Sequence, residues 1–423
     1  MNRRILTAAL GGALGATACG FEGSALVRVA IGDAGERAGP PADAALNSTT
    51  GADATEAATD LVAGYAISAG QSSTCALRLG QVFCWGAGTQ GQLGTGDTSS
   101  RSAPSPAQTT ATFATIEVGD VHACAIATAA AGISCWGGDA YGQLGVGDLT
   151  GRLVPSLVAL PGAARALATG YEFTCAVLFD DSLWCWGQND EGQLGQGDQA
   201  GAPSASVPLP TGAGAKWGAV AAGQGHTCGI QASGALWCWG RNSDGELGIG
   251  PGAPIQVRAP TRVGSEESWA SLDLGQDATC AVKDDGTLWC WGADTFGKLG
   301  TAVEAGAAPP SFIVPTQVGS DADWVEVSVD VFHTCGVKQG GTLWCWGRNA
   351  EGQLGVGDIT DRATPTQVGS ASDWSSVSVG RFHTCAAKTD HTVWCTGENV
   401  AGQLGTSDNA RRNTLTAVAA LPP

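Results

Sequence analysis

The chain has 423 residues, of which 39 are acidic and 21 are basic, so its formal charge at pH 7 is −18. Nucleic-acid binding requires clustered Lys and Arg, and this composition argues against that class of function. Only 14% of the residues are charged, whereas 64 glycines favour many turns and 15 tryptophans supply material for a core. Because the length exceeds what one hydrophobic core usually serves, we expect a modular fold.

Residues 1–18 have the features of an export signal. Two arginines precede an uncharged run over residues 5–18, which is too short to span a bilayer. Residues 14–19 resemble the lipobox of bacterial lipoproteins, in which the cysteine, here Cys19, is acylated and becomes the new N-terminus. The resemblance implies a lipid anchor on Cys19 and a location in the cell envelope, at the outer membrane or the cell surface. Simple secretion after signal cleavage is the alternative.

Residues 19–62 are rich in Ala, Gly, Asp, Thr and Pro and show no periodicity. A segment of this composition does not bury enough apolar surface to form a core, so we predict a disordered tether. Such a tether would hold the rest of the chain, residues 63–423, away from a membrane.

Beyond Tyr65 the sequence repeats about every 52 residues, and the marker of each copy is Cys-Trp-Gly. The marker begins at Cys84, Cys135, Cys185, Cys238, Cys290 and Cys345, and a seventh copy begins at Cys395 with Thr396 in place of Trp. Each copy holds an alternating apolar run, a Gly-x-x turn, a Thr-Cys segment, a Gly-bearing turn, the Cys-Trp-Gly segment and a short final run that often contains Pro. This order predicts four short antiparallel strands.

Four short strands cannot bury both faces of their sheet alone, whereas seven such units in a ring cover one another. The sequence therefore predicts an all-β fold, a seven-bladed β-propeller over residues 63–423. The recurring Gly-x-x-His-Thr-Cys, Leu-Trp-Cys-Trp-Gly-x-Asn and Gly-Gln-Leu-Gly segments resemble the regulator of chromosome condensation repeat family over residues 66–418. That family includes exchange factors for a nuclear GTPase, plant photoreceptors and a secreted propeller that inhibits β-lactamases. The resemblance implies the scaffold, while function differs between members at the rim.

Apart from Cys19, the cysteines fall as two per repeat, 9 to 11 residues apart. Residues at this separation lie opposite each other on the two strands of a hairpin, which predicts one disulfide per repeat. A zinc site is disfavoured because no two cysteines lie two to four residues apart. The predicted pairs are Cys75 with Cys84, Cys124 with Cys135, Cys175 with Cys185, Cys228 with Cys238, Cys280 with Cys290, Cys335 with Cys345, and Cys385 with Cys395.

Three other repeated residue types are interpreted as structural, so neither a metal nor a cofactor is expected. Histidines two residues before a first cysteine would lie one per blade, too far apart to share a metal: His122, His226, His333 and His383. Aspartates after Gly-Gln-Leu-Gly lack the second acidic residue of a calcium site and are predicted to stabilise turns: Asp97, Asp148, Asp198, Asp358 and Asp408. Paired tryptophans such as Trp289 and Trp291 are predicted to fill the core between blades.

Strand direction places the Gly-x-x loop and the Trp-Gly-x-Asn loop of every blade at the same end of the propeller. The Gly-x-x residues differ in every blade although the framework repeats, which favours contact with a partner, and aromatic residues and Arg dominate binding hot spots. The candidate binding residues are Asp120, Val121, Tyr171, Glu172, Phe332, Arg381 and Phe382 from the first loops and Tyr141 and Phe296 from the second loops.

From these features we expect a monomeric, exported and membrane-anchored binding scaffold whose partner is a protein or a cell-surface glycan. Inhibition of a secreted enzyme is the alternative among binding functions. Guanyl-nucleotide exchange, which the family name suggests, would need a cytosolic GTPase and conflicts with the export signal and the predicted disulfides.

An enzyme is not expected. The segment Asp284-x-Gly286-x-x-Trp289 resembles part of the Asp-box of sialidase propellers. Glycosidases of that type need a Tyr nucleophile, a Glu partner and an arginine cluster, whereas this chain has three tyrosines and no evident arginine cluster.

Overall fold

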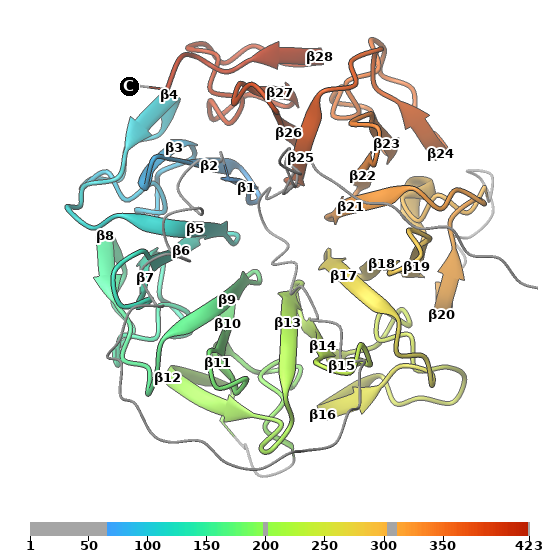
Figure 1. The fold of residues 1–423 in the computed structure, drawn as a ribbon. Helices are drawn as coiled ribbons and strands as arrows, with labels where there is room; N and C mark the ends of the chain where they lie inside the picture. The colour runs from blue at the N-terminus through green and yellow to red at the C-terminus, as the bar shows by residue number, and fades with distance from the viewer. Residues whose placement is uncertain (1–65, 198–201, 303–310, 422–423) are drawn as a thin grey trace, which may run out of the picture.

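The computed structural model describes residues 66–197, 202–302 and 311–421. These residues form seven four-stranded antiparallel sheets arranged as blades in a ring (Figure 1), so the predicted seven-bladed β-propeller is confirmed. Each blade is one stretch of chain whose first strand lies nearest the axis and whose fourth strand forms the outer edge. The export signal, Cys19 and the tether over residues 19–62 lie outside the described residues.

The strands of blades 1 to 4 follow one another along the chain. Blade 1 contains β1 (Ala66–Ala69), β2 (Ser73–Arg78), β3 (Gln81–Gly86) and β4 (Arg101–Pro106). Blade 2 contains β5 (Phe113–Val118), β6 (His122–Ala127), β7 (Ile133–Gly137) and β8 (Arg152–Leu157). Blade 3 contains β9 (Ala164–Thr169), β10 (Phe173–Leu178), β11 (Leu183–Gln188) and β12 (Ser204–Thr211). Blade 4 contains β13 (Trp217–Ala222), β14 (His226–Gln231), β15 (Leu236–Arg241) and β16 (Gln256–Arg262).

Blades 5 to 7 repeat this order, with a short 3-10 helix in blade 5. Blade 5 contains β17 (Trp269–Leu274), β18 (Ala278–Lys283), β19 (Leu288–Ala293), η3 (Thr295–Gly297) and β20 (Ser311–Gln317). Blade 6 contains β21 (Trp324–Val329), β22 (His333–Lys338), β23 (Leu343–Gly347) and β24 (Arg362–Gln367). Blade 7 contains β25 (Trp374–Val379), β26 (His383–Lys388), β27 (Val393–Gly397) and β28 (Arg412–Ala417). No helix among the described residues is long and apolar enough to cross a membrane.

The register of the second and third strands places the two cysteines of each repeat directly opposite each other, as Cys280 and Cys290 illustrate in blade 5. All seven predicted pairs form disulfides with Cα atoms 4.1 Å apart. Each bridge closes a short loop, and loops of this size constrain the unfolded chain by on the order of 2–3 kcal/mol.

Neighbouring blades pack the disulfide face of one sheet against the tryptophan face of the next. Cys280 and Cys290 of blade 5 share a hydrophobic cluster with Trp324 and Trp346 of blade 6. The second tryptophan of each pair is fully buried, as predicted, but the first is only half-buried. The first tryptophan is more exposed because it lies nearer the hairpin turn, at the rim of the interface. In blade 5, for example, the ring of Trp289 packs on that of Trp269 there, and the two ring centroids are 6.4 Å apart.

The two faces of the ring carry different connections. We call the end that carries the Gly-x-x and Trp-Gly-x-Asn loops the loop face, and the end that carries the second-to-third-strand turns the hairpin face. The two loop sets meet on the loop face, because the ring of Phe296, after β19, lies 5.9 Å from that of Phe332, between β21 and β22. Ala66 pairs with Leu77 beside a hairpin turn, so β1 begins on the hairpin face.

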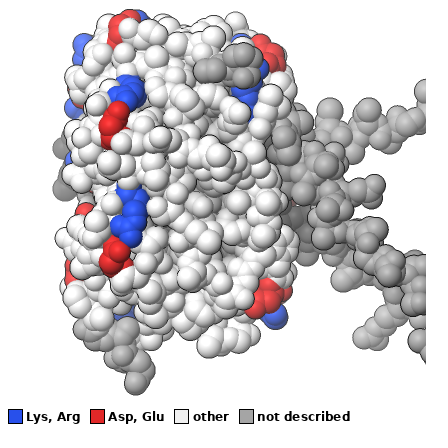
Figure 2. Space-filling model, turned by 90° about the vertical axis from the view of Figure 1, so that its left-hand side faces the viewer, with Lys and Arg blue, Asp and Glu red and all other residues white. Residues whose placement is uncertain are grey.

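Figure 2 shows that one side wall of the ring is mostly uncharged and that its few charges lie in adjacent acidic and basic pairs. Four of the repeated aspartates accept a hydrogen bond from the backbone N–H two residues later and pair with an arginine at 2.6–2.8 Å: Asp97, Asp148, Asp358 and Asp408. These hydrogen bonds lower the pKa of each carboxyl. The predicted turn-stabilising role is confirmed for these four, while Asp198 lies outside the described residues.

Candidate functional site

Three phenylalanines and two arginines from blades 5 to 7 meet on the loop face. We call them the aromatic–guanidinium cluster: Phe296, Phe332, Phe382, Arg348 and Arg381. The rings of Phe332 and Phe382 stack with centroids 5.0 Å apart and planes at 22°. The guanidinium carbon of Arg348 lies 5.1–5.8 Å from all three ring centroids, and that of Arg381 lies 5.5 and 5.9 Å from the two stacked rings. Four predicted binding residues therefore share one patch.

Phe296 is the most solvent-accessible ring of this cluster, with 40% of the residue exposed. Its backbone φ is +62°, in the left-handed region, which costs a bulky residue about 1–3 kcal/mol. The contacts with Phe332 and Arg348 hold the ring on the surface in this conformation.

The two guanidinium groups of the cluster have few charged partners. Arg381 forms no ion pair within the described residues, and its buried Nε has no hydrogen-bond partner there. The nearest carboxylate oxygen to Arg348 belongs to Glu351 at 3.7 Å, and Glu351 makes a closer contact of 2.9 Å with Arg411. With its amide oxygen toward Arg381, the Gln71 side chain accepts a hydrogen bond from that arginine and donates one to Asp120 at 2.9 Å.

Blades 2 and 3 present carboxylates to the same face. We call Asp120, Glu172 and Asp190 the acidic sector, and none of the three forms an ion pair with a described Lys or Arg. Burial raises the pKa of Glu172, and the negative charges of Asp120 and Asp190 raise it further. Burial also raises the pKa of Asp120, an effect that the charge of Arg381 opposes. The loop face therefore carries the unpaired carboxylates of the acidic sector on the side of blades 2 and 3, and the aromatic–guanidinium cluster, with Glu351 and Glu398 near its arginines, on the side of blades 5 to 7.

Tyr171 and Asp330 both line a small cavity that the inner strands enclose at the axis of the ring, and we call this cavity the central channel. The Tyr171 hydroxyl, from blade 3, donates to Asp330 Oδ1, at the end of blade 6, over 3.5 Å. The cavity has a volume of about 90 Å³ and is also lined by Glu117 and Asp273. Burial raises the pKa of Glu117 to about 8, of Asp330 to about 7 and of Asp273 to about 6.

Two further predicted binding residues, Val121 and Tyr141, belong to neither group. Both are half-buried; Val121 packs beside Gly138, and the Tyr141 backbone N–H donates to a glutamine side chain at 3.0 Å. Arg348, by contrast, belongs to the cluster but was not among the predicted residues. It occupies the x of Trp-Gly-x-Asn, a position that differs between most blades, and that variation is the signal that could have identified it.

The repeated histidines are structural, as predicted, although their partner is a threonine of the next blade. Nε2 of His122 lies 2.9 Å from Thr174 Oγ1, and that hydroxyl donates to the Gln143 carbonyl at 2.9 Å. Because the threonine has one proton, the histidine must be the donor to it. Burial lowers the histidine pKa values to about 3 or 4, which keeps the rings neutral: His122, His226, His333 and His383. In the part of the chain that the structure describes, no group of three or more His, Cys, Asp and Glu could hold a metal ion.

Comparison with protein families decides the relationship that these repeats suggest. The family described as RCC1-like domain matches residues 132–423, more than half of the chain. The chain belongs to the RCC1-like domain family. The regulator of chromosome condensation (RCC1) repeat also matches, over residues 80–126.

Several curated proteins resemble this RCC1-like chain. The ultraviolet-B receptor UVR8 of Arabidopsis thaliana is 32% identical over 286 residues, which are 67% of this chain and 64% of the receptor. The mitochondrial RCC1 domain-containing protein RUG3 of the same plant is 27% identical over 317 residues, 67% of this chain and 69% of that protein. The human E3 ubiquitin-protein ligase HERC2 is 26% identical over 295 residues, 69% of this chain but 5% of the ligase. The chain thus spans less than two thirds of the receptor's length.

Solved structures show the same fold at lower sequence identity. Prp20p of Saccharomyces cerevisiae superposes with a TM-score of 0.71 at 20% identity, covering 86% of this chain and 89% of Prp20p. Human WBSCR16 gives a TM-score of 0.70 at 18% identity, covering 80% and 94% of the two chains.

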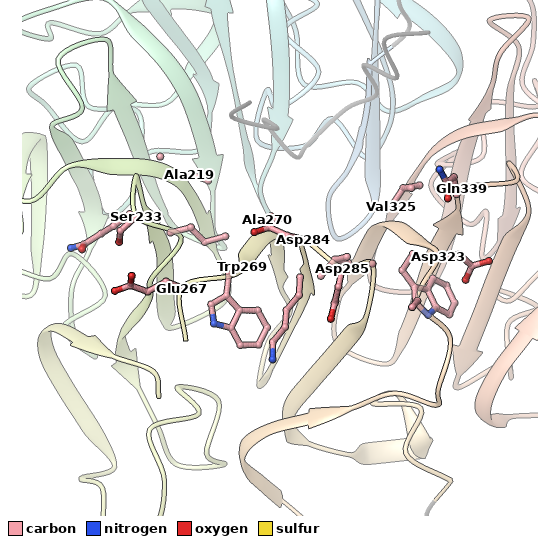
Figure 3. A pocket seen from close by; sticks show the side chains of 18 of the residues that line it. Ala219, Ser233, Glu267, Trp269, Ala270, Asp284, Asp285, Asp323, Val325 and Gln339 are labelled. Carbon is pink, nitrogen blue, oxygen red and sulfur yellow. The ribbon is translucent and has the colours of Figure 1, made fainter. Parts of the chain in front are cut away.

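The hairpin face of this RCC1-like propeller carries a groove of about 830 Å³ across blades 4 to 6. Figure 3 shows Glu267 on one side of Trp269 and Asp323 on the other. In the turn that resembles an Asp-box, Asp285 accepts hydrogen bonds from the backbone N–H and the hydroxyl of Thr287 at 3.0 and 2.6 Å. This turn segment therefore has a structural part in the β18–β19 hairpin.

Proposed function

We propose that this protein is an exported, membrane-anchored binding scaffold that holds a partner protein on its loop face. The observation that carries the proposal is the aromatic–guanidinium cluster. Stacked aromatic rings beside arginines, at residues that differ from blade to blade on a repeated framework, have the composition of a binding hot spot. Solved relatives of the same fold support a protein partner, since Prp20 is described bound to Kap60 and binding to Gsp1p and histones.

The path of the chain supports the anchored arrangement. β1 begins on the hairpin face, so the segment that precedes Ala66, with Cys19 as the proposed lipid attachment site, joins the propeller there. The cluster lies on the opposite face. An anchor on Cys19 would thus attach to the face opposite the cluster and leave the loop face open to a partner.

The chemistry of the channel mouth favours binding over catalysis. A sialidase-like mechanism would need an ionisable Tyr beside a cluster of arginines. Burial and the charge of Asp330 instead raise the pKa of Tyr171, which makes its hydroxyl a poorer nucleophile, although the charge of Arg381 opposes this rise. We infer that the protein is not an enzyme.

Photo-crosslinking in the native cell tests the proposed face. Benzoylphenylalanine at position 332 or 382 should give a covalent adduct with one partner protein. The matched control is the same substitution at Phe179, which is 66% exposed on the hairpin face. Adducts at position 179 and none at 332 or 382 would contradict the proposal, and a glycan partner would give no protein adduct at either place.

The purified partner then permits a quantitative test. Phe332→Ala with Phe382→Ala should weaken binding at least about tenfold, the loss of one hot spot, while the melting temperature changes little because both rings are partly exposed. Unchanged affinity would assign the interface to another surface.

A further inference from the structure

The loop face has a polarity that suggests the chemistry of its partner, and this inference rests on the proposed function. The ring faces of the aromatic–guanidinium cluster already contact the protein's own guanidinium groups, since Arg348 lies within 5.8 Å of all three ring centroids. A second cation from a ligand would be repelled at these rings. The accessible ring of Phe296 therefore suits an apolar or aromatic side chain of a partner.

The acidic sector lies on the other side of the channel mouth. Unlike the phenylalanine rings, it favours a positively charged group of a ligand. Asp120, Glu172 and Asp190 lack ion-pair partners among the described residues, whereas the turn aspartates Asp97, Asp148, Asp358 and Asp408 are paired with arginines at 2.6–2.8 Å. The carboxylates of Asp120 and Asp190 are close enough to Glu172 to disfavour its ionisation. A cation placed among these three carboxylates would relieve their mutual repulsion.

The two regions are connected across the face. Gln71 contacts both Asp120 of the acidic sector and Arg381 of the cluster, and Tyr171 reaches Asp330 between them, over the channel mouth. A ligand that crosses the mouth would therefore meet carboxylates at one end and phenylalanine rings at the other.

We propose that the loop face recognises a segment of a partner protein in which a cluster of Lys or Arg side chains adjoins an exposed aromatic or aliphatic side chain. The basic side chains would lie on the acidic sector, and the apolar side chain would pack against the phenylalanines of the aromatic–guanidinium cluster. An acidic partner that pairs with Arg348 and Arg381 is the opposite arrangement, and the test below separates the two.

A selection of random twelve-residue displayed peptides against the full chain, at near-physiological salt, provides the probe. A parallel selection against the Phe332→Ala, Phe382→Ala variant identifies the peptides that depend on the cluster. These peptides should be enriched in Lys and Arg next to an aromatic or aliphatic residue and depleted in Asp and Glu. Cluster-dependent peptides rich in Asp and Glu would overturn the inferred polarity while leaving the proposed face intact. A selection without cluster-dependent peptides would count against both proposals.

Charge variants then test the acidic sector directly with one selected basic peptide. Glu172→Gln with Asp190→Asn should weaken its binding about tenfold and reduce the salt dependence of the affinity. Glu267→Gln with Asp284→Asn removes the same charge from the hairpin face and should change the affinity less than about twofold. Equal effects of the two pairs would overturn the assignment of the basic side chains to the acidic sector.

Discussion

Nε2 of His383 lies 2.8 Å from Oγ1 of Thr74, although the two residues are 309 positions apart in the chain. This contact joins blade 7 to blade 1, whose sheets share no strand within the described residues. The indole N–H of Trp85 and the Thr74 hydroxyl both donate to the Gln403 carbonyl, at 2.8 and 3.1 Å. The ring is therefore closed by the same His–Thr contact that joins blades 2 and 3, blades 4 and 5, and blades 6 and 7, but without a covalent connection across this interface.

Replacing the closing threonine should open the ring at this interface. Thr74→Val leaves the buried His383 donor and the Gln403 carbonyl with one partner fewer, which costs about 1–3 kcal/mol. Thr174→Val is a matched control, because Thr174 makes the same contact with His122 where the chain itself connects the two blades. We expect a larger fall in the urea midpoint for Thr74→Val, together with new proteolytic sites in blade 1 or 7. Equal midpoint shifts and unchanged cleavage would show that the interface between blades 7 and 1 matters no more for stability than the interface between blades 2 and 3.

Blade 7 contains a compensated exchange that can be tested by a double mutant. On the outer strand of each blade, one residue lies opposite the second cysteine of the repeat. In six blades the residue immediately before it is a proline: Pro104, Pro155, Pro208, Pro260, Pro315 and Pro365. Blade 7 has Leu415 there and Thr396 in place of the buried tryptophan. A Cβ at Gly355 would lie 3.1 Å from Thr396 Cγ2 and 3.5 Å from Leu415 Cγ, so the leucine occupies space that an indole fills elsewhere.

Thr396→Trp alone should therefore overpack this interface and destabilise the protein by about 1–3 kcal/mol. Adding Leu415→Pro restores the pair found in the other six blades and should recover most of that loss. Denaturant melts of both single variants and the double variant would measure the coupling. Additive effects of the two substitutions would show that Leu415 does not compensate for Thr396.

These residues show what could be read from the sequence and what could not. The strands, the disulfides and the meeting of the two loop sets were predictable, because alternation and hairpin register are local properties of one repeat. The partnership of Thr396 with Leu415 was not, since it depends on side-chain volume across two strands. Arg348 was missed and Tyr141 was included in the candidate site for a related reason: variability marks the loop face, but only the order of blades around the ring decides which variable residues become neighbours. The contact of Tyr171 with Asp330 depends on ring geometry and has no local signal.

A buried charge pair in blade 5 gives a third prediction. The Lys298 side chain is fully buried, contacts Asp277 and donates to the Val331 carbonyl at 2.9 Å. Asp277→Ser would leave the ammonium group without its counter-charge and should cost about 3–5 kcal/mol. The double variant Asp277→Ser, Lys298→Gln reproduces the pair that blade 1 has in Ser72 and Gln92, and chemical denaturation should place it close to the parent protein. A double variant as unstable as Asp277→Ser would contradict this.

The central channel predicts a pH dependence with a defined sign. The pKa of Glu117 is raised from 4.5 to about 8 in the folded protein because of burial and the nearby charge of Asp273. The folded state therefore binds this proton more tightly than the unfolded state does. Its contribution to stability is full below pH 4.5 and is lost as the pH rises through about 8. Buried histidines act in the opposite direction, since the pKa of His122 falls from 6.5 to about 3 and its contribution is lost as the pH falls below 6.5.

Glu117→Gln isolates the carboxyl, because the histidines are common to both proteins and glutamine does not titrate. Relative to the parent protein, the variant should gain stability when the pH is raised from 5 to 8.5. At the higher pH the folded parent must either ionise Glu117 inside the channel or keep it protonated in an alkaline solution, and both cost free energy. Urea midpoints at the two pH values and constant ionic strength measure this difference. Glu267→Gln, at an exposed carboxyl of the hairpin face, is the control that should show no such gain. If the stability difference between Glu117→Gln and the parent is the same at pH 5 and 8.5, the carboxyl ionises in the channel as readily as in water.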